Sequence, residues 1–157
     1  MFAPHTFQLK PEREALAHLR WQTETYCAAA GLGPEFASRV VLCLEELLTN
    51  LLTHGGGGGS LAPAIEVGFD LVGERLKVTF ADTGTPFNPT EVPAPDLEAP
   101  VEERRLGGLG IHLVRSLADE LGYERRNGYA WLGNWPESLL EKDFPKWKAR
   151  RANPTSR

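Results

Sequence analysis

The chain contains few cysteines, no long apolar run and no excess of positive charge. Its 157 residues include two cysteines, Cys27 and Cys43, and both lie in helix-like segments without metal-ligand spacing, which predicts reduced core thiols. No apolar run approaches the roughly 20 residues of a membrane-spanning helix, and the first ten residues lack the basic start and apolar core of a signal peptide. We therefore expect a cytoplasmic protein without a membrane partner.

The formal net charge is -4 at pH 7. This charge argues against nucleic-acid binding, because phosphate backbones are bound by concentrated basic surfaces. Acidic residues cluster between Glu91 and Glu103, and basic residues cluster after Phe144. A solvated loop and a frayed chain end are the simplest interpretation of these two clusters.

The length and a hydrophobic fraction of 41% fit one folded domain. We place this domain at 1–135 and a helical, basic tail at 136–157. The elements that periodicity and turn signals predict are a strand at 5–9, helices at 11–30 and 34–54, a hairpin at 64–82, a long proline-rich lid at 83–106, a helix at 107–121 and a hairpin at 123–135. This order predicts an α+β fold, a two-layer sandwich with a mixed, mostly antiparallel sheet and helices on one face.

The first motif is "LCLEELLTNLLTHG", from Leu42 to Gly55, which has acidic and amide side chains within an apolar helical run. At ~100° per residue, Glu46 and Asn50 are separated by ~40°, whereas Glu45 is ~140° from Asn50. Glu46 and Asn50 are therefore expected on one side of the helix, with Glu45 facing away. Taken alone, such a pair is typical of a solvent-facing helix surface.

The second motif is "FADTGTPF", from Phe80 to Phe87, in which a strand ends in an acid and a glycine-containing turn follows. This pattern places the Asp82 carboxylate at the end of a sheet, beside a backbone that Gly84 lets a flat ligand approach. An adenine amino group is a suitable donor to Asp82. An ordinary Asp-Thr-Gly turn is the alternative interpretation.

The third motif is "RRLGGLGIHLV", which starts at Arg104 and has glycines at 107, 108 and 110. Glycines at the start of a helix leave backbone N–H groups open at its positive end, which suits a polyphosphate. The motif is not a Walker loop, since no Gly-Lys-Ser/Thr follows, and it lacks the strand-helix-strand context of a Rossmann fingerprint.

In order and spacing, "EELLTN", "DTGTPF" and "GGLGI" resemble the N, G1 and G2 boxes of the GHKL ATPase superfamily, which has the Bergerat ATP-binding fold. Within that superfamily the chain is similar to the bacterial anti-sigma factor serine/threonine kinases, because His-Gly follows four residues after the Asn and Pro-Phe stands where sensor histidine kinases have a second glycine. The resemblance covers roughly 7–135.

The resemblance implies ATP and Mg²⁺ as cofactors. It implies that Asn50 coordinates Mg²⁺ held by the phosphates, that Asp82 binds the adenine amino group, and that Gly84 leaves room for the base. It also implies that Glu46 is the catalytic general base that takes a proton from the attacking hydroxyl. For His54, capping or packing at the helix end and contact with nucleotide remain equal alternatives.

The resemblance further implies that Gly107, Gly108 and Gly110 shape the end of the lid against the phosphates. Either Arg104 or Arg105 is placed to neutralise the charge of the γ-phosphate, with a solvated arginine pair as the alternative. The acidic, proline-rich lid, the "GGGGGS" loop and the tail depart from the family pattern, and none of these departures removes a motif residue.

The function implied is a protein serine/threonine kinase that binds Mg-ATP, phosphorylates a STAS-domain anti-anti-sigma protein and binds a sigma factor, with partner exchange as the switch. Homodimerisation is common in that group. The alternative is a regulatory module that binds nucleotide or protein without phosphoryl transfer. Intact Glu46, Asn50 and Asp82 favour the enzyme.

Overall fold

The structure is a computed structural model that describes residues 2–54, 63–94, 96, 98, 109–126 and 129–133, with backbone only at 125–126 and 129–133. The elements in chain order are β1 (His5–Leu9), α1 (Ala15–Ala29), α2 (Pro34–His54), β2 (Ile65–Val72), β3 (Arg75–Asp82), α3 (Leu109–Leu117), β4 (Gly122–Arg126) and β5 (Tyr129–Gly133). The segment 136–157, expected to be a helical basic tail, lies outside the described residues, as does the glycine-rich loop.

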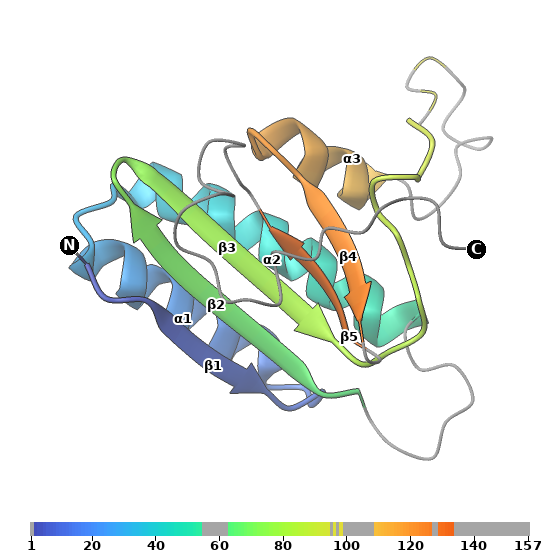
Figure 1. Cartoon of the computed structure of the whole chain (residues 1–157), viewed down its shortest axis with the longest axis horizontal. Coiled ribbons are helices and arrows are strands. Elements are labelled where there is room, and N and C mark those ends of the chain that lie inside the picture. Colours follow the sequence, from blue (N-terminus) through green and yellow to red (C-terminus); the bar gives the residue numbers. More distant parts are fainter. Residues whose placement is uncertain are drawn as a thin grey trace.

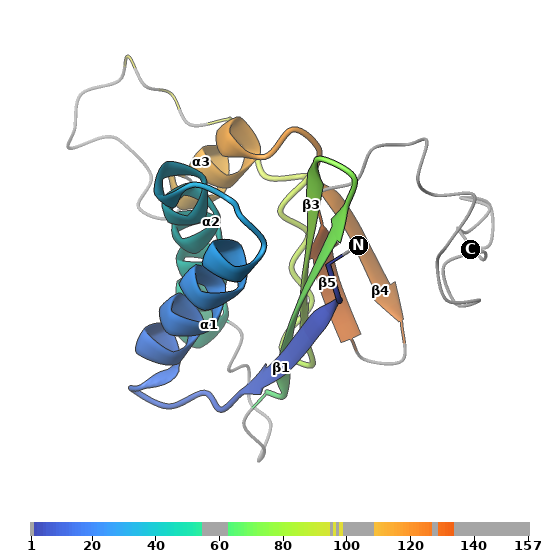
Figure 2. The ribbon, with the colours of Figure 1, turned by 90° about the vertical axis from the view of Figure 1, so that its left-hand side faces the viewer.

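The strands form one sheet in the order β1-β2-β3-β5-β4, and each described pairing is antiparallel. Figure 1 shows this sheet in front of the helices. The view in Figure 2 separates the molecule into two layers, with α1, α2 and α3 together on one side and the strands on the other. The fold is therefore the expected α+β two-layer sandwich, except that the sheet, expected to be mixed, is antiparallel at every described pairing.

The predicted hairpin, formed by β2 and β3, lies at the centre of the sheet, and its strands are joined by a turn at Gly73-Glu74. Gly73 has φ 61°, a conformation that a side chain with a Cβ adopts only with strain. Alternate residues of β2, including Ile65, Val67 and Phe69, are buried against the helices. This alternation fixes the register, because a slip of one residue would turn the apolar set to the opposite face.

The helix α1 starts at Ala15, so the expectation of a start at Pro11 is wrong by four residues. Residues 10–15 instead form turns, in which Glu12 N–H donates to Lys10 O and Ala15 N–H donates to Glu12 O. Ala15 is also the first residue of the segment that is buried in the core. Tertiary contact, rather than the proline, therefore sets the first turn.

The helix α3 ends at Leu117, earlier than the expected stop at Gly122, and its buried residues are Ile111 and Val114. Leu109, the first residue of the helix, is 62% exposed. Ile111 and Val114 are one turn apart, and both belong to the buried cluster that contains the α2 leucines. The chain then leaves the helix before Leu121, which packs only partly against the core.

The apolar core lies between the two layers. The helix α2 contributes most to it, and its fully buried leucines are Leu44 and Leu48. Of the two cysteines, both free, Cys27 is buried in this core and Cys43 is partly exposed. Within the described part of the chain, no helix is both long and apolar enough to cross a bilayer.

Leu48 and Leu52 on α2 provide a test of this packing. Leu48→Ala is expected to lower the free energy of unfolding by about 2–5 kcal/mol, because Leu48 has no exposed surface and its removal leaves a cavity. Leu52 is 41% exposed, so Leu52→Ala is expected to change it by about 0.5 kcal/mol or less. Urea unfolding measures both, and equal losses would contradict the placement of α2.

Candidate functional site

The first two sequence motifs meet at a cavity of about 270 Å³ between the C-terminal half of α2 and the end of β3. Its walls combine apolar side chains with a small number of polar groups, which is the usual composition of a small-molecule site. The residues that line it are Leu47, Asn50, Leu51, His54, Phe80, Asp82, Thr85, Pro86, Phe87 and Tyr123.

Asn50 from α2 and Asp82 from β3 line this one cavity, although 32 positions separate them in the sequence. The helix α2 runs behind the sheet in roughly the direction of β3 (Figure 1), and Asn50 in its C-terminal half lines the cavity together with the end of β3. The Nδ2 atom of Asn50 is buried and has no hydrogen-bond partner among the described residues. A buried amide donor without a partner costs about 1–3 kcal/mol, which a bound ligand with an acceptor would relieve.

Asp82 is held at the start of the turn that follows β3. Its Oδ1 accepts a hydrogen bond of 2.8 Å from the backbone N–H of Gly84. Thr83 fixes the same turn to the start of β2, since its N–H donates to Ala64 O at 3.1 Å and its Oγ1 accepts from Ala64 N–H at 2.8 Å. The carboxylate of Asp82 is therefore presented to the cavity from a fixed backbone.

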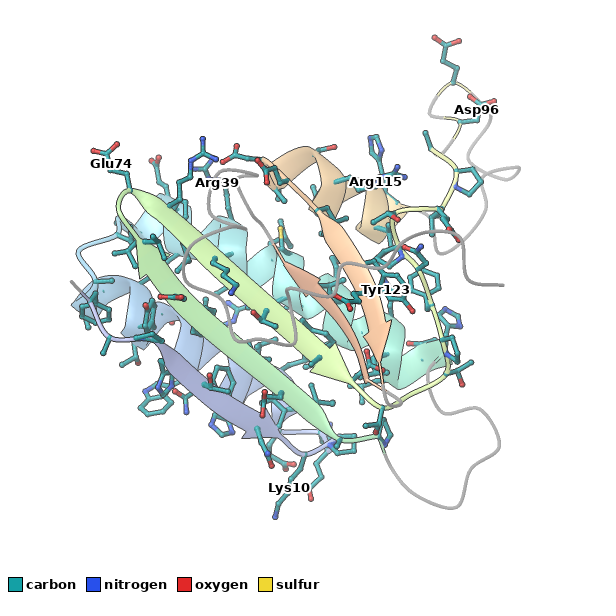
Figure 3. The ribbon with its side chains drawn as sticks, in the orientation of Figure 1. Lys10, Arg39, Glu74, Asp96, Arg115 and Tyr123 are labelled. Atoms are coloured by element: carbon teal, nitrogen blue, oxygen red, sulfur yellow. The ribbon has the colours of Figure 1, made fainter. Side chains whose placement is uncertain are left out.

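The segment after this turn is anchored to α3 by Arg115, which Figure 3 labels. The guanidinium of Arg115 donates to Val92 O at 2.6 Å and to Thr90 O at 3.1 Å. The Asn88 side chain accepts hydrogen bonds from both the N–H and the hydroxyl of Thr90. These bonds hold the chain that follows the second motif against the helix that carries the third.

The side chain of Glu46 lies against the backbone of Gly110 at the start of α3. A Cβ placed on Gly110 would overlap the Glu46 carboxylate, so only glycine fits this approach in the present arrangement. The neighbouring Glu45 points to α1 instead, where its Oε1 accepts a hydrogen bond of 2.7 Å from Arg20. The two adjacent acids thus face different helices, as the helical spacing predicts.

The predicted site residues are therefore only partly brought together. Asn50 and Asp82 line the cavity, and the N–H of Gly84 donates to Asp82. Glu46 instead contacts Gly110 and is not among the lining residues. Gly107, Gly108, Arg104 and Arg105 lie outside the described residues.

Sequence reasoning missed Tyr123, which Figure 3 labels on β4 and which lines the cavity from that edge strand of the sheet. No local pattern marked it, because its place depends on the strand order β3-β5-β4. Phe87 belongs to the second motif and is 46% exposed. An aromatic residue shortly after a glycine-containing turn is a signal that the sequence does carry.

The residues of this cavity fit a nucleotide with Mg²⁺. The unpartnered Asn50 amide offers Nδ2 donors suited to a phosphate oxygen and an Oδ1 of the type that binds Mg²⁺. Among the described side chains, no three His, Cys, Asp or Glu residues come together to hold a metal.

Comparison with known proteins places these motifs in a family. A family model described as histidine kinase-like ATPase domain matches residues 9–134. The serine/threonine-protein kinase BtrW of Bordetella bronchiseptica is 30% identical over 90 residues, which cover 57% of this chain and 63% of BtrW. The serine-protein kinase RsbW of Listeria monocytogenes is 27% identical over 120 residues, covering 74% of this chain and 76% of RsbW.

A solved structure supports the fold independently. The RsbU and RsbW domains of Rv1364c from Mycobacterium tuberculosis superpose with a TM-score of 0.60 at 16% sequence identity. The match covers 84% of this chain and 31% of that chain. At 16% sequence identity this similarity is evidence for the fold alone.

Gly110 gives a test of the contact with Glu46. Gly110→Ala is expected to leave the free energy of unfolding within about 1 kcal/mol of the parent, because alanine favours the helix by about that amount and the overlapping atoms belong to a flexible side chain. The carboxylate of Glu46 should move away from its present position. A crystal structure of the variant checks the position, and urea unfolding checks the stability.

Gly33→Ala is the matched control, because a Cβ at Gly33 meets nothing within 4 Å. It should leave the Glu46 carboxylate in place. An unmoved Glu46 in Gly110→Ala would show that the two residues do not touch.

Proposed function

Because this chain belongs to the histidine kinase-like ATPase domain family, we propose that it is an ATP-dependent protein serine/threonine kinase. Its substrate is a serine or threonine of a small STAS-domain anti-anti-sigma protein, and its second partner is a sigma factor. The observation that supports this most directly is the shared cavity of Asn50 and Asp82, with Glu46 one helical turn from Asn50. The similarity to proteins named serine-protein kinases supports the reaction class.

In this proposal the residues of the cavity hold Mg-ATP. Asp82 accepts a hydrogen bond from the adenine amino group, and Gly84 lets the base approach the backbone. Asn50 provides the amide oxygen for Mg²⁺ beside the phosphates. When bound, Mg-ATP supplies the transferable phosphoryl group, and the metal neutralises charge on the phosphate oxygens.

Glu46 acts as the general base. It accepts the proton of the substrate hydroxyl as that oxygen attacks the γ-phosphorus, and the ADP oxygen leaves with the bond electrons. A positioned base of this kind contributes about 10²- to 10⁴-fold to the rate. The contact with Gly110 keeps the carboxylate on the side of α2 that faces α3, away from the Arg20 that binds Glu45.

Partner switching follows from one protein having two binding partners. The unphosphorylated antagonist draws the kinase away from the sigma factor, and phosphorylation of the antagonist releases the kinase. Localisation in the cytoplasm is part of the same proposal. Gly107, Gly108 and Arg105 are assigned to the phosphates by the sequence motif alone.

A second candidate is a regulatory module that binds nucleotide or protein without phosphoryl transfer. The observation in its favour is that Glu46 lies against Gly110 and does not line the cavity. Where the module binds nucleotide, it shares the nucleotide site with the kinase, and the two candidates then differ in the outcome of replacing Glu46.

Glu46→Gln is expected to lower phosphoryl transfer by about 10²-fold or more and to leave the Kd for Mg-ATP unchanged, because the amide keeps the shape but cannot accept the proton. Transfer is measured with γ-labelled ATP against a panel of purified STAS-domain proteins, and the first protein that is labelled serves for all variants. Unchanged transfer would show that Glu46 is not the base.

Glu45→Gln is the matched control for Glu46→Gln. It removes only the ion pair with Arg20, whose side chain is 55% exposed, and such surface pairs stabilise by about 0–1 kcal/mol. Both its transfer rate and its nucleotide affinity should equal those of the parent. If the parent chain labels no STAS protein although it binds Mg-ATP, the second candidate is favoured.

Asp82→Ala is expected to abolish nucleotide binding while the fold survives, because it removes the acceptor for the adenine amino group. At 100 times its Kd, Mg-ATP stabilises the parent by about 2.7 kcal/mol, which a thermal shift resolves. The variant should show no shift with Mg-ATP or Mg-ADP. A normal shift would mean that another acid recognises the base.

A further inference from the structure

A second cavity, of about 230 Å³, lies between α2, β3 and the end of α3. Its lining includes residues of the three sequence motifs, but none of the residues to which the proposed function assigns a role, such as Glu46, Asn50 and Asp82. Its lining residues are Phe36, Arg39, Val40, Cys43, Leu44, Leu47, Leu76, Val78, Phe80, Val114, Leu117, Ala118, Asp119, Glu120 and Leu121.

One stripe of α2 forms the largest wall of this cavity, with lining residues three and four positions apart from Phe36 to Leu47. The early end of α3 at Leu117 provides the opposite side, because residues 118–121 leave the helix and pass along the cavity. Helix α3 is too short to fill this space between α2 and β3.

The charged residues of the cavity lie at its exposed edge and include both signs. Arg39 is exposed, with its guanidinium 5.6 Å from the centre of the Phe36 ring. Figure 3 shows Arg39 at the same end of the molecule as Glu74. Asp119 is also exposed, and Oε1 of Glu120 lies 3.9 Å from Nη1 of Arg75. Neither sign of charge dominates this edge, whereas the interior is aliphatic and aromatic.

We propose that this cavity is a binding site for a small, uncharged aromatic molecule of one or two rings. An apolar cavity of about 150 Å³ is enough to bind benzene, so 230 Å³ accommodates a larger ring system. Cavities with apolar walls and a few polar groups at one edge are the usual form of small-molecule sites. Mixed charge at the edge gives no preference to an anion or a cation.

The second cavity shares a wall with the nucleotide cavity. Leu47 and Phe80 line both, and both side chains are buried in a close-packed core. A ligand that displaces these two side chains toward the nucleotide cavity weakens nucleotide binding, and the nucleotide weakens the ligand by the same factor. Only this coupling rests on the proposed function, since the site itself does not require a nucleotide.

Indole is the probe for the site, titrated into the full chain by calorimetry. Saturable binding to one site is expected, and it should protect Cys43, which lines the cavity, from a small methanethiosulfonate reagent. Labelling is run at pH 9, because burial raises the pKa of Cys43 to about 11. Cys27 is fully buried and should remain unlabelled throughout. No saturable binding, or binding without protection of Cys43, overturns the proposal.

Val40→Phe places a ring in the cavity and should weaken indole binding at least tenfold. Leu42→Phe is the matched control, because Leu42 lies on the same helix, is 37% exposed and lines neither cavity. Far-ultraviolet circular dichroism and the urea midpoint confirm that each variant is folded. Equal weakening in both variants, or none in Val40→Phe, places indole elsewhere on the protein.

Two charged analogues test the ligand class. Indole-3-acetate and tryptamine should bind no more tightly than indole, and tenfold tighter binding of either would overturn the choice of an uncharged ligand.

The coupling between the two cavities is tested with nucleotide. Saturating Mg-ADP should raise the Kd of indole by about fivefold or more. An unchanged Kd for indole, with Mg-ADP shown to bind, rejects the coupling but does not affect the proposal of the indole site itself. Absence of any nucleotide binding instead rejects the proposed function.

Discussion

The approach of the Glu46 carboxylate to the backbone of Gly110 is the contact that determines where the proposed base lies. Residue 110 has no side chain, so the first turn of α3 lies directly beside α2. Ile111, the next residue, can then be fully buried in the cluster formed by the α2 leucines. Asn50, one turn after Glu46, reaches the cavity at the end of β3. A larger residue at 110 would have to displace the carboxylate.

The sequence predicts most of the architecture, because the strongest signals are local. The alternating pattern of β2 and the glycine turn at Gly73 define the central hairpin, and Pro34 marks the start of α2. The errors fall at helix ends, where tertiary contacts decide. Burial of Ala15 sets the start of α1, and α3 stops at Leu117, before the glycine expected to end it.

The candidate site is predictable to a similar degree. Local spacing and the resemblance to the N and G1 boxes pointed to Asn50 and Asp82, and both residues line one cavity in the structure. Two features depend on packing between distant elements and have no local signal. Tyr123 reaches the cavity because of the strand order, and the second cavity exists because α3 is shorter than its apolar pattern suggests. Both proposals therefore depend on how α2 packs against α3 and against the sheet.

The most direct test of the central claim is a crystal structure of the full chain with Mg²⁺ and a non-hydrolysable ATP analogue. We predict that the adenine amino group lies within hydrogen-bond distance of Asp82, and that Asn50 binds the metal or a phosphate oxygen. An analogue bound elsewhere, or a site that remains empty at saturating concentration, would contradict the assignment of this cavity as the nucleotide site.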